Sequence, residues 1–281
     1  MMVQATIGAI AAYDVVDPTG KHLLVANYAA DPNTGASFVV LPIQADGTLG
    51  PASDVFSPSG RGPNPDRQLS PHPHQVHFDP AGRFVFGPDL GTDKIWSWTL
   101  DTAAGTLVPN PTLPYDQVAS GSGPRHMDFH PSGRFVYVID EMASSITAFT
   151  YDSTQGTFLW IETVSTLPPE FTGTSTTAEI LVHPSGRFLY GSNRGHDSIV
   201  GFAINQTTGK LRRIGWWSTQ GHIPRSFNID PSGRLLLVGN QDTDTIVPFR
   251  IDQRSGELAW TGAVTQTPTP VCIQFGRPVR G

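Results

Sequence analysis

The chain has 281 residues with a formal net charge of −6, and only 15% of them are charged. Proteins that bind nucleic acids usually carry a basic surface, so this charge balance argues against such a partner. No run of about 18 apolar residues occurs, which excludes an ordinary membrane-spanning helix. We therefore expect neither a nucleic acid nor a membrane as a partner.

The chain starts with an apolar stretch, residues 1–13, that lacks the basic residues with which a signal peptide begins. We expect this stretch to form the first strand instead. The single cysteine, Cys272, excludes an internal disulfide framework and is expected to be a small buried side chain. Together these features predict a cytoplasmic protein.

Five four-residue turns punctuate the chain, each with Pro in second place and Gly in last place. They begin at Asp17, Asp79, His130, His183 and Asp230, so the repeat is 47 to 62 residues long. Pro at the second position and Gly at the fourth are typical of a type I turn. We expect the Asp and His side chains to cap these turns rather than to take part in chemistry.

Each turn lies between a short strand and a hydrophobic strand, and the third repeat shows the whole pattern. Its expected strands cover residues 126–129, 134–139, 145–151 and 157–162. The second of them is almost entirely apolar, as in a strand buried on both faces, and the third alternates in period two. The hydrophobic strand recurs at residues 22–26, 84–86, 188–190 and 235–238. The turn before the fourth strand recurs at residues 46–49, 105–107, 209–211 and 256–258.

Four antiparallel strands in a period of about 50 residues indicate the blade of a β-propeller, so the fold class is all-β. We expect residues 1–281 to form a single β-propeller domain. Five complete blades are visible in the sequence, followed by an extra C-terminal strand over residues 270–275.

The blade topology sorts the loops onto two faces. The five turns lie on one face, and the loops that lead into each first strand or join the second and third strands lie on the other. That other face gathers basic, acidic and imidazole side chains: His72, His74, Arg125, His126, Glu141, Glu179, Arg194, His196, Arg225 and Gln241. Several arginines beside histidines and glutamates predict a site for an anion with acid or base groups at hand. The alternative is a solvated polar rim held by ion pairs.

Three histidines, His72, His74 and His77, have a spacing that could suggest a metal site. Along a strand, however, His72 and His74 share one side and His77 points to the other. No cysteine accompanies them, and the nearest carboxylates face arginines. We therefore expect no metal and no other cofactor.

Seven short motifs follow one another along the chain, at residues 71–75, 88–93, 123–126, 178–180, 192–199, 224–227 and 268–272. In these motifs the chain resembles the lactonase family of seven-bladed β-propellers. That family includes the propeller-type 6-phosphogluconolactonases and the 3-carboxy-cis,cis-muconate lactonizing enzymes. Relative to the family, the chain is expected to be shortened at its N-terminus.

The resemblance implies a metal-free enzyme in which His74, Arg125, Glu141 and Arg194 are catalytic. The other residues gathered on the same face are expected to bind the substrate: His72, His126, Glu179, His196, Arg225 and Gln241. The expected activity is a lactonase that hydrolyses a sugar-acid lactone such as 6-phosphogluconolactone, with His74 or Glu141 activating water and the arginines stabilising the oxyanion.

Two alternatives stay open at this stage. The first is a cycloisomerase that forms a lactone from 3-carboxy-cis,cis-muconate, since this reaction needs the same arginine-rich pocket with one acid/base pair. The second is a propeller that binds without catalysis, because a fold alone does not imply chemistry. For the enzyme hypotheses the expected partner is a small anionic substrate, a lactone or a polycarboxylate. The sequence does not indicate the oligomeric state.

Overall fold

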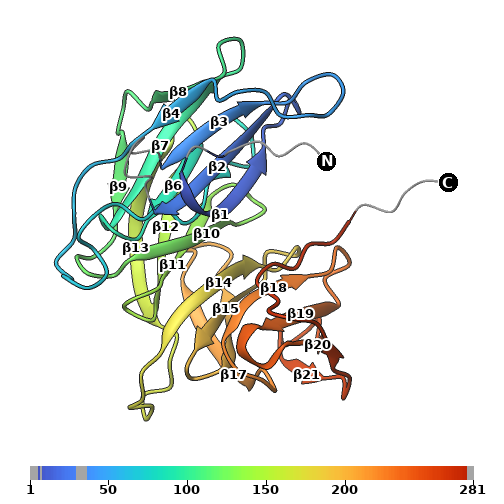
Figure 1. The fold of residues 1–281 in the computed structure, drawn as a ribbon. Coiled ribbons are helices and arrows are strands. Elements are labelled where there is room, and N and C mark those ends of the chain that lie inside the picture. The colour runs from blue at the N-terminus through green and yellow to red at the C-terminus, as the bar shows by residue number, and fades with distance from the viewer. Residues whose placement is uncertain (1–5, 7, 30–36, 277–281) are drawn as a thin grey trace. The chain divides into compact units, whose positions relative to one another are not determined.

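The structure is a computed structural model that describes residues 6, 8–29 and 37–276. Part of the expected first strand, residues 1–5 and 7, lies outside the described residues. Over the rest of the chain the strands form five sheets in chain order, labelled in Figure 1. Neighbouring strands pair antiparallel, as in β1 with β2 and β15 with β16.

The first three sheets each contain four strands in sequence order, and a short strand is added to the second sheet. The first sheet comprises β1 (Ala9–Val16), β2 (His22–Ala29), β3 (Phe38–Pro42) and β4 (Asp54–Phe56). The second comprises β5 (His77–Phe78), β6 (Val85–Asp89), β7 (Lys94–Asp101) and β8 (Thr106–Pro109), with β9 (Tyr115–Gln117) pairing to β7. The third comprises β10 (Pro124–Phe129), β11 (Phe135–Asp140), β12 (Ser145–Asp152) and β13 (Thr157–Ser165).

The last two sheets repeat this order. The fourth comprises β14 (Thr176–Val182), β15 (Phe188–Arg194), β16 (Ser198–Ile204) and β17 (Leu211–Ser218). The fifth comprises β18 (Pro224–Ile229), β19 (Leu235–Asn240), β20 (Thr245–Ile251) and β21 (Leu258–Trp260), with β22 (Thr265–Gln266) pairing to β20. The five predicted blades are confirmed. Among the described residues the one helical element is a short 3-10 turn, Gln241–Thr243. The described part of the chain contains no helix long and apolar enough to span a membrane.

The chain divides into two compact units. The first comprises Met1–Phe129, Asp140–Ala143 and Thr150–Leu159, and the second comprises His130–Ile139, Ser144–Phe149 and Trp160–Gly281. Each unit has its own apolar core. In the second unit, Phe188, Phe227 and Phe249 are at most 3% exposed, and each such buried ring contributes about 1.5–3 kcal/mol. The single-domain interpretation stays a prediction.

The five turns close in one way. In each, the N–H of the fourth-place glycine donates to the carbonyl of the first residue, as Gly82 does to Asp79 at 2.8 Å. The five glycines have φ between 67° and 72°, a left-handed conformation that a side chain would strain. In the Asp turns the carboxylate caps the backbone that follows: Asp79 Oδ1 accepts from the N–H groups of Arg83 and Phe84 at 2.6 and 3.0 Å. The predicted structural role of these residues is therefore confirmed.

The two histidine turns use the ring to join one repeat to the next. In His183, Nδ1 accepts from the N–H of Ser185 at 3.1 Å, so the proton lies on Nε2. Nε2 then donates to the carbonyl of Gly233, in the next turn along the chain, at 2.8 Å. His130 makes the same bonds to Ser132 and Gly186. The predicted capping role of both histidines is confirmed, and the bond to the next repeat is an addition.

The extra strand predicted at residues 270–275 is wrong, because these residues belong to no strand. They follow β18 through side-chain bonds: Asn228 Nδ2 donates to the Ile273 carbonyl at 2.8 Å, and the Ile273 N–H points to Ser226 Oγ at 3.3 Å. Pro270 has no N–H for a ladder. Cys272, expected to be buried, is exposed in this segment.

Replacing His183 should separate its two roles. His183→Ala removes the bond to the Gly233 carbonyl, which keeps its bond from Gln253 Nε2 at 2.7 Å, and also removes the local cap. The free energy of unfolding should fall by about 1–3 kcal/mol, because two hydrogen bonds worth about 0.5–1.5 kcal/mol each are lost. His183→Asp restores the type of cap seen at Asp230 but not the bond to Gly233, so it should recover part of that loss. Urea denaturation measures both; an alanine variant as stable as the wild type would contradict this role.

Asp116 on β9 should make stability depend on pH. Its carboxylate is buried, Oδ2 has no hydrogen-bond partner among the described residues, and burial raises the pKa to about 7 despite a backbone hydrogen bond from Phe158. The folded state therefore binds this proton more tightly than the unfolded state. The resulting stabilisation is full below the ordinary carboxyl pKa of 3.8 and is lost as the pH rises through about 7.

Asp116→Asn removes this titration. Between pH 5 and pH 8 the wild type should lose roughly 2.5 kcal/mol of unfolding free energy relative to the variant. Urea denaturation of both proteins at the two pH values gives this difference directly. If the unfolding free energies of wild type and variant changed equally with pH, Asp116 would not be the group responsible for the pH dependence.

Candidate active site

A proline-rich segment positions two of the predicted site histidines. Pro71 and Pro73 have no N–H groups, so the chain cannot form a regular ladder before β5. It is held instead by the end of β6: the Leu90 N–H donates to the His72 carbonyl at 3.1 Å, and the His74 N–H to the Pro88 carbonyl at 3.0 Å. The buried carboxylate of Asp89 accepts from the His72 N–H at 2.6 Å. Burial raises the pKa of Asp89 although four hydrogen bonds oppose this.

Tyr28, near the end of β2, fixes the two rings. Its ring stacks on His72 with centroids 4.7 Å apart and meets the edge of His74 at 5.5 Å. The His72 Nδ1–H donates to the Tyr28 carbonyl at 2.9 Å. The His77 ring lies beside Phe129 instead, with ring centroids 5.9 Å apart. The prediction that His72 and His74 share one side and His77 takes the other is confirmed.

Glu141 lies between two arginines. Its Oε1 is 2.6 Å from Arg67 Nη2, and its Oε2 is 3.0 Å from Arg125 Nε. The second contact is an ion pair by distance, since the N–H of Nε does not point at the oxygen. Glu141 and Arg125 side chains are 5% and 3% exposed, whereas Arg67 is 37% exposed. Burying the carboxylate is tolerable because both of its oxygens face cations.

Arg67 is also held by Tyr28, whose hydroxyl accepts from Nη2 at 3.2 Å. Partial burial opposes the charged form of Arg67, but the bonds to Glu141 and Tyr28 outweigh it and raise the pKa. Arg67 therefore stays protonated. Two guanidinium groups and one carboxylate give this cluster a net charge of about +1, which suits an anionic ligand.

A second chain of contacts joins Arg125 to the histidines. Arg125 Nη1 lies 3.3 Å from His126 Nε2, and His74 Nδ1 lies 3.2 Å from the same nitrogen. A guanidinium can only donate, so His126 Nε2 must be the acceptor. His74 Nδ1 must then also donate to it. A neutral His74 consequently carries its lone pair on Nε2, the arrangement required of a general base.

The structure thus brings together five of the predicted residues in the first unit: His72, His74, Arg125, His126 and Glu141. Tyr28 and Arg67 belong to the same cluster and were not predicted. Both lie outside the repeated motifs. Arg67 follows a Pro- and Gly-rich loop, and this composition alone gave no reason to select it.

The other predicted residues lie in the second unit. Arg194, at the end of β15, donates from Nη2 to the Thr177 carbonyl at 2.6 Å. Glu179 on β14 accepts from the Ile180 N–H at 3.2 Å, and His196 Nδ1 lies 2.6 Å from Ser198 Oγ. Arg225 is the second residue of β18, and Gln241 is in the 3-10 turn, where it donates to Asp242. Whether these five residues join the cluster of the first unit stays a prediction.

Among the described residues no group of three or more histidine, cysteine or acidic side chains lies close enough to hold a metal ion. The groups of the first unit that could act on a ligand are two arginines, a buried carboxylate and the imidazoles of His74 and His126. These groups can bind an anion, stabilise a developing oxyanion and move a proton.

A family model described as a seven-bladed β-propeller lactonase matches residues 2–275. A 6-phosphogluconolactonase of Bacillus subtilis is 36% identical over 260 residues, which are 92% of this chain and 71% of that protein. Seven other curated relatives are covered over only 50–62% of their length.

Two solved structures are similar over nearly the whole chain. A Bacteroides fragilis protein superposes with a TM-score of 0.89 at 35% identity, covering 99% of this chain and 76% of that one. The periplasmic gluconolactonase of Pseudomonas aeruginosa gives a TM-score of 0.88 at 32% identity, covering 96% of this chain and 74% of that one.

The proton positions can be checked directly. Long-range ¹H–¹⁵N correlation NMR of the imidazoles at neutral pH should show His74 protonated on Nδ1 and unprotonated on Nε2, and should show His126 in the same form. The reason is that Arg125 and His74 both donate to His126 Nε2. A His74 ring that carries its proton on Nε2 would contradict the proposed hydrogen-bond order.

Proposed function

Because this chain belongs to the seven-bladed β-propeller lactonase family, we propose that it hydrolyses the lactone of a sugar acid such as 6-phosphogluconolactone. The observation that carries this proposal is the cluster of the first unit, in which Arg125 is fixed between the Glu141 carboxylate and the His74–His126 pair. A fixed cation beside an imidazole with a lone pair is what ester hydrolysis at a carbonyl carbon requires.

His74 is the proposed general base. Its Nε2 takes a proton from water as the water oxygen attacks the lactone carbonyl carbon. The carbonyl π electrons move to the oxygen, and the Arg125 guanidinium stabilises the resulting oxyanion. When the carbonyl re-forms, the bond to the ring oxygen breaks, and the proton held on His74 passes to that oxygen. The product is the open hydroxy acid.

Glu141 is better suited to position the arginines than to act as the base. Two guanidinium groups stabilise its charged form, which makes the carboxylate a poor proton acceptor. With Glu141 held, Arg125 keeps one orientation and needs no rearrangement as charge develops. Arg67 is proposed to contact an anionic group of the substrate, because it belongs to the cluster and is partly exposed.

The remaining assignments rest on the family resemblance. Arg194 is proposed as a further catalytic cation. The proposed substrate-binding residues are His72, His126, Glu179, His196, Arg225 and Gln241. All of these assignments are proposals for this chain. It covers 71% of the length of the Bacillus protein but only 62% and 50% of the length of two other relatives.

Kinetics of single variants test the assignment. His74→Asn and Arg125→Ala should each lower kcat for 6-phosphogluconolactone by about 100-fold or more, because each removes a group used in the transition state. Arg213→Leu is the matched control, since Arg213 packs over the Trp216 ring at 4.4 Å and belongs to no proposed site. Its rate should equal that of the wild type, after subtraction of spontaneous hydrolysis.

The same assay separates the competing functions. Turnover of 3-carboxy-cis,cis-muconate to a lactone, without hydrolysis of sugar lactones, would replace the proposal by cycloisomerisation. Absence of both activities, with 6-phosphogluconate still bound, would favour a binding protein. Near-wild-type hydrolysis by His74→Asn would remove His74 as the base.

A further inference from the structure

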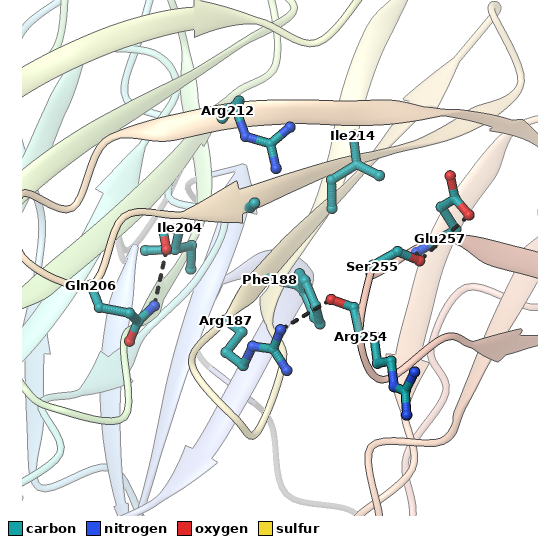
Figure 2. Close-up of a pocket in the computed structure, with 10 residues that line it drawn as sticks. Arg187, Phe188, Ile204, Gln206, Arg212, Ile214, Arg254, Ser255 and Glu257 are labelled. Atoms are coloured by element: carbon teal, nitrogen blue, oxygen red, sulfur yellow. Dashed lines mark hydrogen bonds between the residues drawn. The ribbon is translucent and has the colours of Figure 1, made fainter.

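A groove of about 420 Å³ lies in the second unit, and none of its lining residues belongs to the proposed active site. Apolar side chains of β15, β16 and β17 line it, namely Phe188, Ile204 and Ile214. Its charged lining residues are Arg187, Arg212, Arg254 and Glu257. Figure 2 shows Arg212 and Ile214 projecting from β17 toward Arg187 and Phe188.

Arg187 is explained by the fold. It donates from Nη1 and Nη2 to the carbonyls of Gln253 and Arg254 at 2.9 and 3.0 Å, and it lies over the Phe188 ring at 5.1 Å. Arg134 occupies the same place in its own repeat, over Phe135. A guanidinium has five N–H groups, so two bonds to carbonyls hold it still and leave donors for another partner.

Arg212 is not explained by the repeat. It is the third residue after the turn glycine Gly209, and the equivalent positions after Gly105, Gly156 and Gly256 hold Val, Leu and Ala. Its guanidinium makes no hydrogen bond or ion pair with the described residues, and it is exposed. In the first repeat the same position, after Gly47, holds Gly50, so among the five repeats only the fourth carries a cation there.

The remaining groups of the groove define what would bind. Three arginines and one glutamate beside apolar side chains give the groove a net positive charge, which attracts a localised anionic group such as a phosphate or a carboxylate. The Glu257 carboxylate and the side-chain amide oxygen of Gln206 can accept hydrogen bonds from hydroxyl groups. The volume lies in the usual range for small-molecule sites of about 300–1,000 Å³.

We propose that this groove is a binding site for a small hydroxylated organic anion, a sugar phosphate or a similar acid. Arg187 and Arg212 bind the anionic group, the apolar floor contacts the carbon skeleton, and Glu257 accepts from a hydroxyl. The groove shares no residue with the proposed lactonase site, so the two proposals can be tested independently.

The test uses the full chain and D-glucose 6-phosphate as the probe. The Nε–Hε signal of Arg212 in ¹H–¹⁵N spectra, assigned by its absence in Arg212→Leu, reports on the groove and not on the active site. Saturable shifts of this signal are expected with D-glucose 6-phosphate. Inorganic phosphate, which lacks the carbon skeleton, should bind with an affinity about tenfold lower. D-glucose, which lacks the charge, should cause no shift.

Arg187 and Arg213 provide the matched comparison. Leucine occupies the equivalent position in the third repeat, so Arg212→Leu should be tolerated. In this variant the shifts of the Arg187 signal should require about tenfold more ligand. Arg213→Leu removes the same charge one residue away and should leave the affinity unchanged. The proposal is overturned if the Arg212 signal does not respond, if inorganic phosphate binds as well as the sugar phosphate, or if Arg213→Leu weakens binding equally.

Discussion

Polar bonds between successive repeats connect otherwise similar sheets into defined units. Within the second unit, His183 reaches the turn glycine Gly233 of the next repeat, and Tyr190 donates to the Gly256 carbonyl at 2.8 Å. Both acceptors are buried carbonyls, and a buried carbonyl without enough hydrogen bonds is costly in an apolar interior. The Gly233 carbonyl also accepts from Gln253 Nε2 at 2.7 Å. The glycines are required twice, for their left-handed φ and because another side chain approaches them closely: a Cβ on Gly233 would lie 2.7 Å from the His183 ring.

The same constraint leaves the other ends of the strands available for chemistry. The turns are committed to holding repeats together, and their Asp and His residues have structural partners. The loops at the opposite strand ends have no repeated sequence to preserve, so they can carry Arg125, Glu141 and the 71–75 segment. Glu141 then organises its surroundings, because opposite charges stabilise a buried ionised carboxylate and its two oxygens face Arg67 and Arg125.

Much of this could be predicted from the sequence, for local reasons. A Pro–Gly turn followed by an apolar strand depends only on neighbouring residues, so all five blades were identified correctly. The chemistry of the face opposite the turns followed from topology, which placed His74 and Arg125 together. Residues 270–275 were not predicted correctly, because whether an apolar stretch becomes a strand depends on an unpaired edge of suitable geometry. Arg67 was missed since its contact with Glu141 spans 74 positions and leaves no periodic signal.

In the proposed site, the Nε2 of His74 and the guanidinium of Arg125 face the carbonyl of a bound lactone. A crystal structure of the protein with 6-phosphogluconate, the hydrolysis product, would show whether they do. We expect a product carboxylate oxygen within about 3 Å of an Arg125 nitrogen, and another carboxylate oxygen or a water within hydrogen-bond distance of His74 Nε2. A product molecule bound in the structure with no contact to either residue would contradict the account.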